Sequence, residues 1–345
     1  MIPSYSIDIF PRLFHFKKPA GTSRGVYTER RSWYVRVASA ACPGREGWGE
    51  CAPLPQLSVD DLPDYEGVLR GICAEVARTG QVDTERWREY PSMLFGLETA
   101  LRHLERGTYA LWDTPFSRGE EGICIDGLIW MGDHDAMYRQ IREKLEAGFR
   151  CVKLKIGAIG FEEELDLLRF IRRHFPAREV ELRVDANGAF APAEALDKLK
   201  RLAELDLHSI EQPIRAGQWD EMAGLTSVSP LPIAFDEELI GHCSLEAKRR
   251  LLDALHPQYI VLKPSLHGGF SGCREWIEEA EKRNVGWWIT SALESNVGLN
   301  AIAQWCATWH TRMPQGLGTG MLFTDNVPMP LEIRKDCLWY VADGD

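Results

Sequence analysis

The sequence predicts an α/β protein in which a parallel barrel is joined to a smaller α+β domain. Between residues 153 and 263, short runs of β-forming residues each end in a charged residue, and these charges recur roughly every 25 to 30 positions, the length of one strand-plus-helix unit. The chain has 345 residues, whereas a barrel alone takes about 250. Strands precede helices in the first third of the chain, and the two alternate afterwards.

Residues 1–113 are expected to form the α+β domain. A small, polar loop at residues 20–26 could close over a site in the other domain, or it could simply join two strands. The predicted elements are two strands followed by two helices, at residues 5–10, 32–38, 62–78 and 92–106.

Residues 114–325 show the rhythm of the barrel. Eight parallel strands in one sheet should close on themselves. The strands are predicted near residues 123–129, 151–156, 181–184, 208–210, 233–235, 259–262, 287–289 and, with a weaker pattern, 315–317. The helices are predicted at residues 135–147, 161–174, 192–204, 219–225, 244–252, 272–283 and 299–308. The remaining tail, residues 326–345, is expected to pack back on the first domain.

The composition argues against several classes of protein. The formal charge of −11 argues against a nucleic-acid partner, which would need clustered Lys and Arg. No apolar stretch approaches the roughly 20 residues of a membrane span, and the start lacks the pattern of a secretory signal. Nine cysteines without a Cys-x-x-Cys pair favour reduced thiols. We therefore expect a cytoplasmic protein without a membrane or nucleic-acid partner.

Two lysines stand out on the second predicted barrel strand. Lys153 and Lys155 are two residues apart, so their side chains leave the strand on the same face, while Val152, Leu154 and Ile156 face the helices. A Lys-x-Lys pair on an exposed edge would simply be solvated. Inside a barrel, however, two ammonium groups need nearby anions.

Three acids at consecutive strand ends could supply those anions. Each of Asp185, Glu211 and Asp236 could alone be a helix N-cap or part of a structural ion pair. Together at one barrel mouth they would repel one another unless a cation lay among them. Oxygen ligands suit Mg²⁺, with Mn²⁺ as an alternative. The absence of His-x-His and His-Glu-x-x-His motifs argues against a zinc hydrolase.

Lys263 ends the strand after that of Asp236 and should lie across the barrel from Lys153 and Lys155. A base, a metal and an opposite cation suit the abstraction of a proton α to a carboxylate. The metal would stabilise the enediolate, while a neutral lysine takes the proton. The predicted partner is therefore a small-molecule carboxylate.

The motifs together resemble the enolase superfamily, in the branch with paired lysines that includes muconate lactonising enzymes, dipeptide epimerases and o-succinylbenzoate synthases. The resemblance covers almost the whole chain. It implies a modified (β/α)₇β TIM barrel, an N-terminal capping domain completed by the C-terminal tail, Mg²⁺ on the three acids, acid/base roles for Lys155 and Lys263, and an electrostatic role for Lys153. The motifs are Gly47-Trp-Gly-Glu50, Lys153-Leu-Lys155, Asp185-Ala-Asn187, Glu211-Gln-Pro213, Asp236-Glu237 and Lys263-Pro264.

Within this branch, residues 125–132, 291–300 and 316–323 resemble the o-succinylbenzoate synthases of the Bacteroidetes type. The resemblance implies syn-dehydration of 2-succinyl-6-hydroxy-2,4-cyclohexadiene-1-carboxylate to 2-succinylbenzoate, in menaquinone biosynthesis. In this reading Lys155 removes the α-proton and then helps hydroxide leave on the same face. Lys263 stabilises the intermediate.

Other readings stay open. The same skeleton serves epimerases or racemases of dipeptides and N-acylamino acids, although residues 316–320 lack the acidic pair common near the last strand of dipeptide epimerases. Muconate cycloisomerase shares the skeleton as well. A catalytically silent barrel that acts as a binding module is a further alternative, against which the intact set of six charged residues argues.

Substrate contacts are predicted just beyond the sixth and seventh barrel strands. Ser265, Ser291 and Asn296 could bind a substrate carboxylate or could merely cap loops. Gly318, within Gly316-x-Gly-x-Gly320, could offer backbone amides to a carboxylate or could form a tight turn. A homo-oligomer is compatible with the sequence but not indicated by it.

Overall fold

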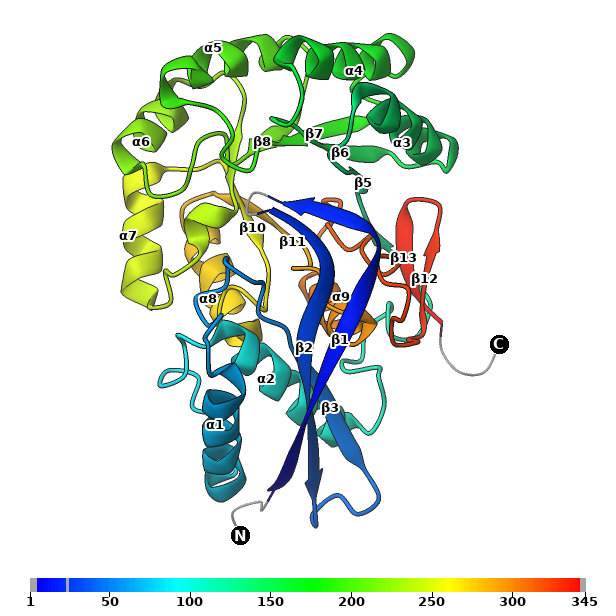
Figure 1. Cartoon of the computed structure of the whole chain (residues 1–345), viewed down its shortest axis with the longest axis vertical. Coiled ribbons are helices and arrows are strands. Elements are labelled where there is room, and N and C mark those ends of the chain that lie inside the picture. The colour runs from blue at the N-terminus through cyan, green and yellow to red at the C-terminus, as the bar shows by residue number, and fades with distance from the viewer. Residues whose placement is uncertain (1–4, 23–24, 342–345) are drawn as a thin grey trace.

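The computed structural model describes residues 5–22 and 25–341. Residues 23–24 of the predicted 20–26 loop, and the last four residues of the tail, lie outside the described residues. Figure 1 shows two bodies, with the N-terminal strands and two helices at the bottom and a ring of helices around a sheet above them.

The N-terminal body is an antiparallel sheet covered by two helices. Its strands β1 (Tyr5–Thr22), β2 (Gly25–Ser39) and β3 (Glu46–Cys51) pair in that order, and α1 (Tyr65–Thr79) and α2 (Pro91–Arg106) follow. The β1–β2 hairpin is much longer than the strands at residues 5–10 and 32–38 that the sequence predicts. Pro11 and Pro19 interrupt the strand signal of β1 in the sequence, although Phe14 and Phe16 in this part are buried. The motif Gly47-Trp-Gly-Glu50 has a glycine at position 49 because β3 lies very close to α2. A Cβ at this position would lie 1.9 Å from the carbonyl oxygen of Gly96 on α2.

The second body is a parallel sheet wrapped by helices. The strands β5 to β11 pair in sequence order, and one helix follows each of them, from α3 to α9. The strands are β5 (Gly127–Ile129), β6 (Cys151–Lys155), β7 (Glu181–Asp185), β8 (Ser209–Glu211), β9 (Ile233–Phe235), β10 (Tyr259–Leu262) and β11 (Gly286–Ile289). The helices are α3 (His134–Glu146), α4 (Phe161–His174), α5 (Pro192–Ala203), α6 (Trp219–Val228), α7 (Leu245–Leu255), α8 (Gly269–Glu281) and α9 (Asn296–Cys306).

Two residues complete the barrel sheet between its last strand, β11, and its first, β5. The backbone N–H of Gln315 donates to the carbonyl of Cys124 at 2.9 Å, and that of Gly316 donates to the carbonyl of Ile289 at 2.9 Å. They occupy the place of the predicted eighth strand but form only two isolated parallel bridges, Gln315 with Ile125 and Gly316 with Thr290. The predicted fold class, a (β/α)₇β barrel with a capping domain, is confirmed.

The C-terminal segment touches both bodies. Phe323 forms an antiparallel bridge with Phe16 on β1, and the N–H of Lys17 donates to the carbonyl of Leu322 at 2.8 Å. The final hairpin, β12 (Leu331–Arg334) and β13 (Cys337–Tyr340), pairs instead with β4 (Ile123–Cys124), directly before the barrel. The domain limits at residues 113 and 325 stay predictions.

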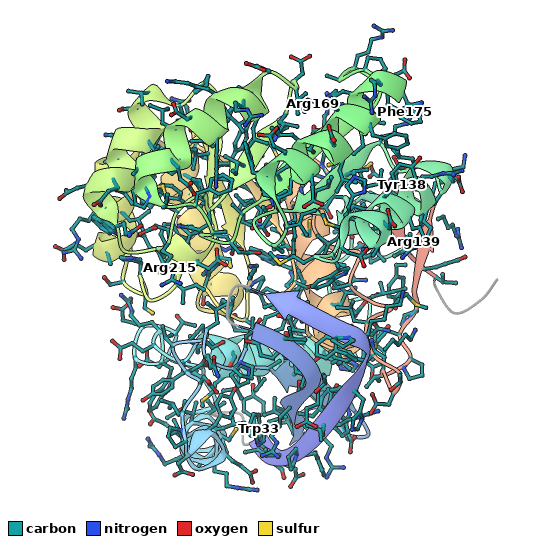
Figure 2. All side chains as sticks on the ribbon, turned by 45° about the horizontal axis from the view of Figure 1, so that its top comes forward. Trp33, Tyr138, Arg139, Arg169, Phe175 and Arg215 are labelled. Atoms are coloured by element: carbon teal, nitrogen blue, oxygen red, sulfur yellow. The ribbon has the colours of Figure 1, made fainter. Side chains whose placement is uncertain are left out.

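The largest apolar cluster lies between the barrel sheet and its helices. The outer faces of these helices carry long polar side chains, as Figure 2 shows for Arg139 on α3 and Arg169 on α4. Among the described residues, no helix combines the length and apolar character that a membrane span requires.

Candidate active site

A cavity lies where the carboxyl ends of the barrel strands face the capping domain, and its lining divides into two parts. The first part, which we call the charged half, is formed by polar and charged residues: Asp126, Lys153, Lys155, Asp185, Asn187, Asp236, Glu237 and Lys263. The second part, the neutral half, is formed by Leu54, Leu57, Leu128, Trp130, Thr290, Ser291, Ala292, Leu293, Gly316, Gly318 and Thr319.

The charged half lies at the edge of the sheet where the parallel strands end. Lys153 and Lys155 lie on β6, both almost fully buried, while Leu154 between them packs in the apolar cluster outside the sheet. Asp185 is the last residue of β7, Asp236 follows β9 directly, and Lys263 follows β10 directly. Neighbouring parallel strands in register bring these residues to one edge of the sheet.

Three buried carboxylates meet at this edge. Glu211 ends β8 and is paired with Asp185 in the register of the two strands, although it lies beneath the cavity rather than in its lining. One carboxylate oxygen each from Asp185, Glu211 and Asp236 lies within 4.8 Å of the others. Oxygen donors at this spacing, without His or Cys, are the donor set that hard divalent cations prefer, so the three residues could hold a metal ion.

Each acid is paired with a lysine, and Asp185 also lies 3.8 Å from a second one, Lys153. The distances from Nζ are 2.8 and 3.0 Å from Lys153 to the two Glu211 oxygens, 3.0 Å from Lys155 to Asp185 Oδ2, and 2.6 Å from Lys263 to both Asp236 oxygens. Three lysines thus lie beside three carboxyl groups, which is the pairing that burial of so many ionisable groups requires.

The pKa values of the acids depend on their burial and on these ion pairs. Burial raises the pKa of Glu211 to about 8, with Asp185 and Asp236 adding to the rise and Lys153 opposing it. Burial alone would also raise the pKa of Asp185, but Lys155 and Lys153 outweigh it and hold the value at about 2.

The same balance acts on two of the lysines. Burial would lower the pKa of Lys153, but Glu211, Asp185 and Asp126 together raise it. The pKa of Lys263 is likewise raised, against burial, by Asp236 and Glu237. Both side chains are therefore ammonium ions in this arrangement.

Two further residues shape the charged half. Asn187 accepts a hydrogen bond from Lys155 Nζ at 2.8 Å and donates to Glu237 Oε1 at 3.0 Å. Both side chains line the cavity. The motifs Asp185-Ala-Asn187 and Asp236-Glu237 contained them, but the spacing of charges at strand ends could not single out an amide or a second acid. Asp126, a buried acid in the lining, was not predicted at all.

The neutral half contains two of the four predicted substrate contacts. Ser291 and Gly318 line the cavity, and Ser291 Oγ lies 2.6 Å from Oγ1 of Thr319. Of the described residues that line the cavity, none is Ser265 or Asn296. Ser265 Oγ instead donates to Glu294, and Asn296 begins α9, where its N–H donates to Asn326.

Comparisons with known proteins agree with this geometry. Residues 136–340 match the family described as Enolase C-terminal domain-like, and residues 22–104 match the N-terminal domain of MenC. The o-succinylbenzoate synthase of Desulfotalea psychrophila is 47% identical, over 92% of this chain and 94% of that protein.

Solved structures extend the comparison. The crystal structure of MenC from Desulfotalea psychrophila superposes with a TM-score of 0.82 at 41% identity, over 97% of this chain and 99% of that one. The L-Ala-D/L-Glu epimerase of Bacillus subtilis has a TM-score of 0.83 over 99% of this chain and 96% of that one. Its identity is only 19%, so this likeness concerns the fold alone.

Proposed function

The chain belongs to the enolase superfamily and, within it, to the o-succinylbenzoate synthases, and we propose that the six charged residues at the cavity carry out the reaction. It is a lyase of menaquinone biosynthesis that removes water from a small-molecule carboxylate. The observation that supports the proposed roles is the buried pairing of three lysines with three acids at one barrel mouth. The Bacteroidetes subtype stays a prediction.

The reaction breaks two bonds of 2-succinyl-6-hydroxy-2,4-cyclohexadiene-1-carboxylate. Lys155, as a neutral amine, takes the proton from the carbon that bears the carboxylate, and the electron pair moves into the enediolate. When the ring double bond forms, hydroxide leaves the neighbouring carbon and takes the proton from the Lys155 ammonium, so that water and aromatic 2-succinylbenzoate result. Asp185 and Asn187 accept hydrogen bonds from Lys155 Nζ and hold it in place for both transfers.

The other two lysines act as fixed positive charges. Lys153 remains an ammonium ion because Glu211 and Asp185 stabilise its charge. Lys263 remains an ammonium ion beside Asp236. Both stabilise the negative charge that develops on the substrate when its proton is removed.

Asp185, Glu211 and Asp236 would hold the metal ion. We propose Mg²⁺, with Mn²⁺ as an alternative, because the donor set consists of carboxylate oxygens alone. When bound, such an ion supplies Lewis-acid stabilisation of the negative charge on the substrate carboxylate. The proposed compartment is the cytoplasm, because the nine cysteines are all unpaired.

The decisive experiment is a dehydration assay. Purified protein is mixed with freshly prepared substrate and MgCl₂, and the rise in aromatic absorbance is followed, with a parallel sample in excess chelator. We expect turnover in the first sample and none in the second. Absence of turnover with Mg²⁺ or Mn²⁺ would overturn the proposed function.

The epimerase alternative has a separate test. Dipeptides and N-acylamino acids are incubated with the protein in heavy water, and deuterium at the α-carbon is measured by NMR. We expect no incorporation, since residues 316–320 contain no acid that could bind a substrate ammonium group. Incorporation at a rate comparable with dehydration would add epimerisation as a second activity.

A further inference from the structure

We propose that Arg30 of the capping domain is a positioning residue that sets the shape of the neutral half of the cavity and thereby the affinity for substrate. It does so by holding residues 291–295, which we call the 291–295 turn and which include the left-handed backbone of Leu293, in place. The inference rests on the proposed function, because it concerns how the same cavity selects its substrate.

Arg30 donates hydrogen bonds to both sides of the neutral half, the barrel side and the capping side. It lies on β2 with only 2% of its surface exposed. Its Nη1 donates to the carbonyl of Ala292 at 2.5 Å, and its Nη2 donates to the carbonyl of Ala52 at 2.6 Å. Ala292 belongs to the barrel side of the cavity, and Ala52 begins the segment that carries Leu54 to the capping side. One guanidinium therefore fixes the distance between the walls.

The backbone of the turn carries strain that must be balanced by contacts. Leu293 has a φ of 63°, in the left-handed region, which is unfavourable for a leucine because its Cβ crowds the backbone. The Ala292 N–H donates to Glu294 Oε2 at 2.7 Å, and the other carboxylate oxygen of Glu294 accepts from Ser265. Strained residues persist where surrounding groups over-determine them, and here they line the cavity.

A second residue of the capping sheet holds the far end of the turn. Glu50, on β3, accepts hydrogen bonds from the N–H of Ser295 at 3.0 Å, from Ser295 Oγ at 2.5 Å and from the N–H of Gly298 at 3.0 Å. The carboxylate thus satisfies N–H groups at the start of α9. Tyr34 adds a hydroxyl contact to Ser295 Oγ at 2.6 Å. These contacts give a role to the Glu50 of the Gly-Trp-Gly-Glu motif, which the proton-transfer scheme leaves unused.

The charges around Arg30 complete the arrangement. Glu50 and Glu294 are the carboxylates that act on its guanidinium, yet both of its own hydrogen bonds go to carbonyl groups. Its orientation is therefore set by the two backbone segments and not by a salt bridge. Among the described contacts of Arg30, none involves the six charged residues of the reaction, so its loss should alter substrate binding more than the chemistry.

The test compares Arg30→Lys and Arg30→Met with the wild type in the dehydration assay. Lysine keeps the charge but has one nitrogen in place of the fork, so it cannot reproduce both hydrogen bonds. We expect Arg30→Lys to raise KM about tenfold, which is the loss of one charge-assisted hydrogen bond. The value of kcat should change less than threefold, roughly, and the Mg²⁺ affinity should stay within about twofold of the wild type. Arg30→Met should raise KM further.

Two other variants separate positioning from folding. Arg36→Met, on the same strand, removes exposed ion pairs with Asp8 and Glu46 and should leave KM unchanged. Tyr34→Phe deletes only the hydroxyl that contacts Ser295 and should raise KM by a smaller factor than Arg30→Lys. If the Arg30 variants do not fold, Tyr34→Phe decides the question.

An unchanged KM in the folded Arg30 variants, or a parallel fall of kcat and Mg²⁺ affinity, would overturn the inference. The proposed function would stand in that case, because the wild type would still be active. An inactive wild type would instead remove both.

Discussion

The two halves of the cavity are built in different ways. The charged half comes from one edge of a single sheet, with lysines and acids on β6 and β7 and directly after β9 and β10. The neutral half is assembled from the capping domain, from the end of β5, from the segment after β11 and from the segment that closes the barrel. The regular part of the molecule carries the chemistry, and the part where separate segments meet carries the choice of substrate. Four measurements test this distinction.

The largest effect is expected in the charged half. Lys155→Ala removes the proposed base and should lower kcat on the order of 10³-fold, within the range of general-base contributions. The measurement is the dehydration rate at saturating substrate. Lys200→Ala, an exposed lysine on α5 paired with Asp197, is the matched control and should retain full activity. Unimpaired turnover by Lys155→Ala would refute the proton-transfer scheme.

Removal of a metal ligand should have the next largest effect. Asp236→Asn should weaken Mg²⁺ binding by about a hundredfold or more, since even partners of the ligating residues often contribute ten- to a hundredfold. Isothermal calorimetry with MgCl₂ measures this directly. Asp253→Asn, on the exposed face of α7 and paired with Arg283, is the control. Equal affinities in the wild type and in Asp236→Asn would contradict the ligand assignment.

A third measurement contrasts the lysine-paired acids with a buried acid that has no lysine partner among the described residues. Asp60, in the capping domain, accepts hydrogen bonds from the N–H and Oγ of Ser92, and burial raises its pKa from 3.8 to about 6. The folded state therefore holds the proton more tightly than the unfolded state. Its stabilising contribution is present below about pH 3.8 and is lost as the pH rises through about 6, with a total of about 3 kcal/mol.

Denaturant unfolding of the wild type and of Asp60→Asn between pH 4 and pH 7.5 checks this prediction. The stability of the wild type relative to the variant should fall as the pH rises. A difference that does not change with pH would show that Asp60 is ionised in both states.

The smallest effect is expected from a single hydroxyl of the neutral half. Ser291→Ala removes the partner of the Thr319 hydroxyl and should raise KM by roughly fivefold, equivalent to one hydrogen bond of about 1 kcal/mol. The value of kcat should change little, because Ser291 contacts none of the three lysines in the described structure. A large fall in kcat with unchanged KM would contradict the proposal that the charged half carries the chemistry and the neutral half binds the substrate.

The sequence could predict the regular part of the molecule because its signals are local. The helical spacing at residues 161–174 matches α4 (Phe161–His174) in both limits. The spacing of the two lysines and the charges at strand ends predicted Lys153, Asp185 and Lys263 as site residues, because parallel strands bring their carboxyl ends to one edge.

The neutral half could not be predicted in the same way. Arg30 and Ala292 are 262 residues apart, and no periodicity connects them. The side chain of Ser265 is engaged by Glu294, which depends on the tertiary structure. The closing segment at Gln315 and Gly316 gave only a weak strand pattern, because it consists of two bridged residues whose hydrogen-bond partners, Cys124 and Ile289, lie elsewhere in the sequence.

The bridge between Phe16 and Phe323 has a consequence for the order of events during synthesis. The first strand of the chain cannot reach its C-terminal neighbour until more than 300 further residues have left the ribosome. At about 5 to 20 residues per second, the edge of β1 near Phe16 stays unpaired for at least about 15 seconds. During that interval this exposed edge is a place where a nascent chain could pair with another chain or bind a chaperone.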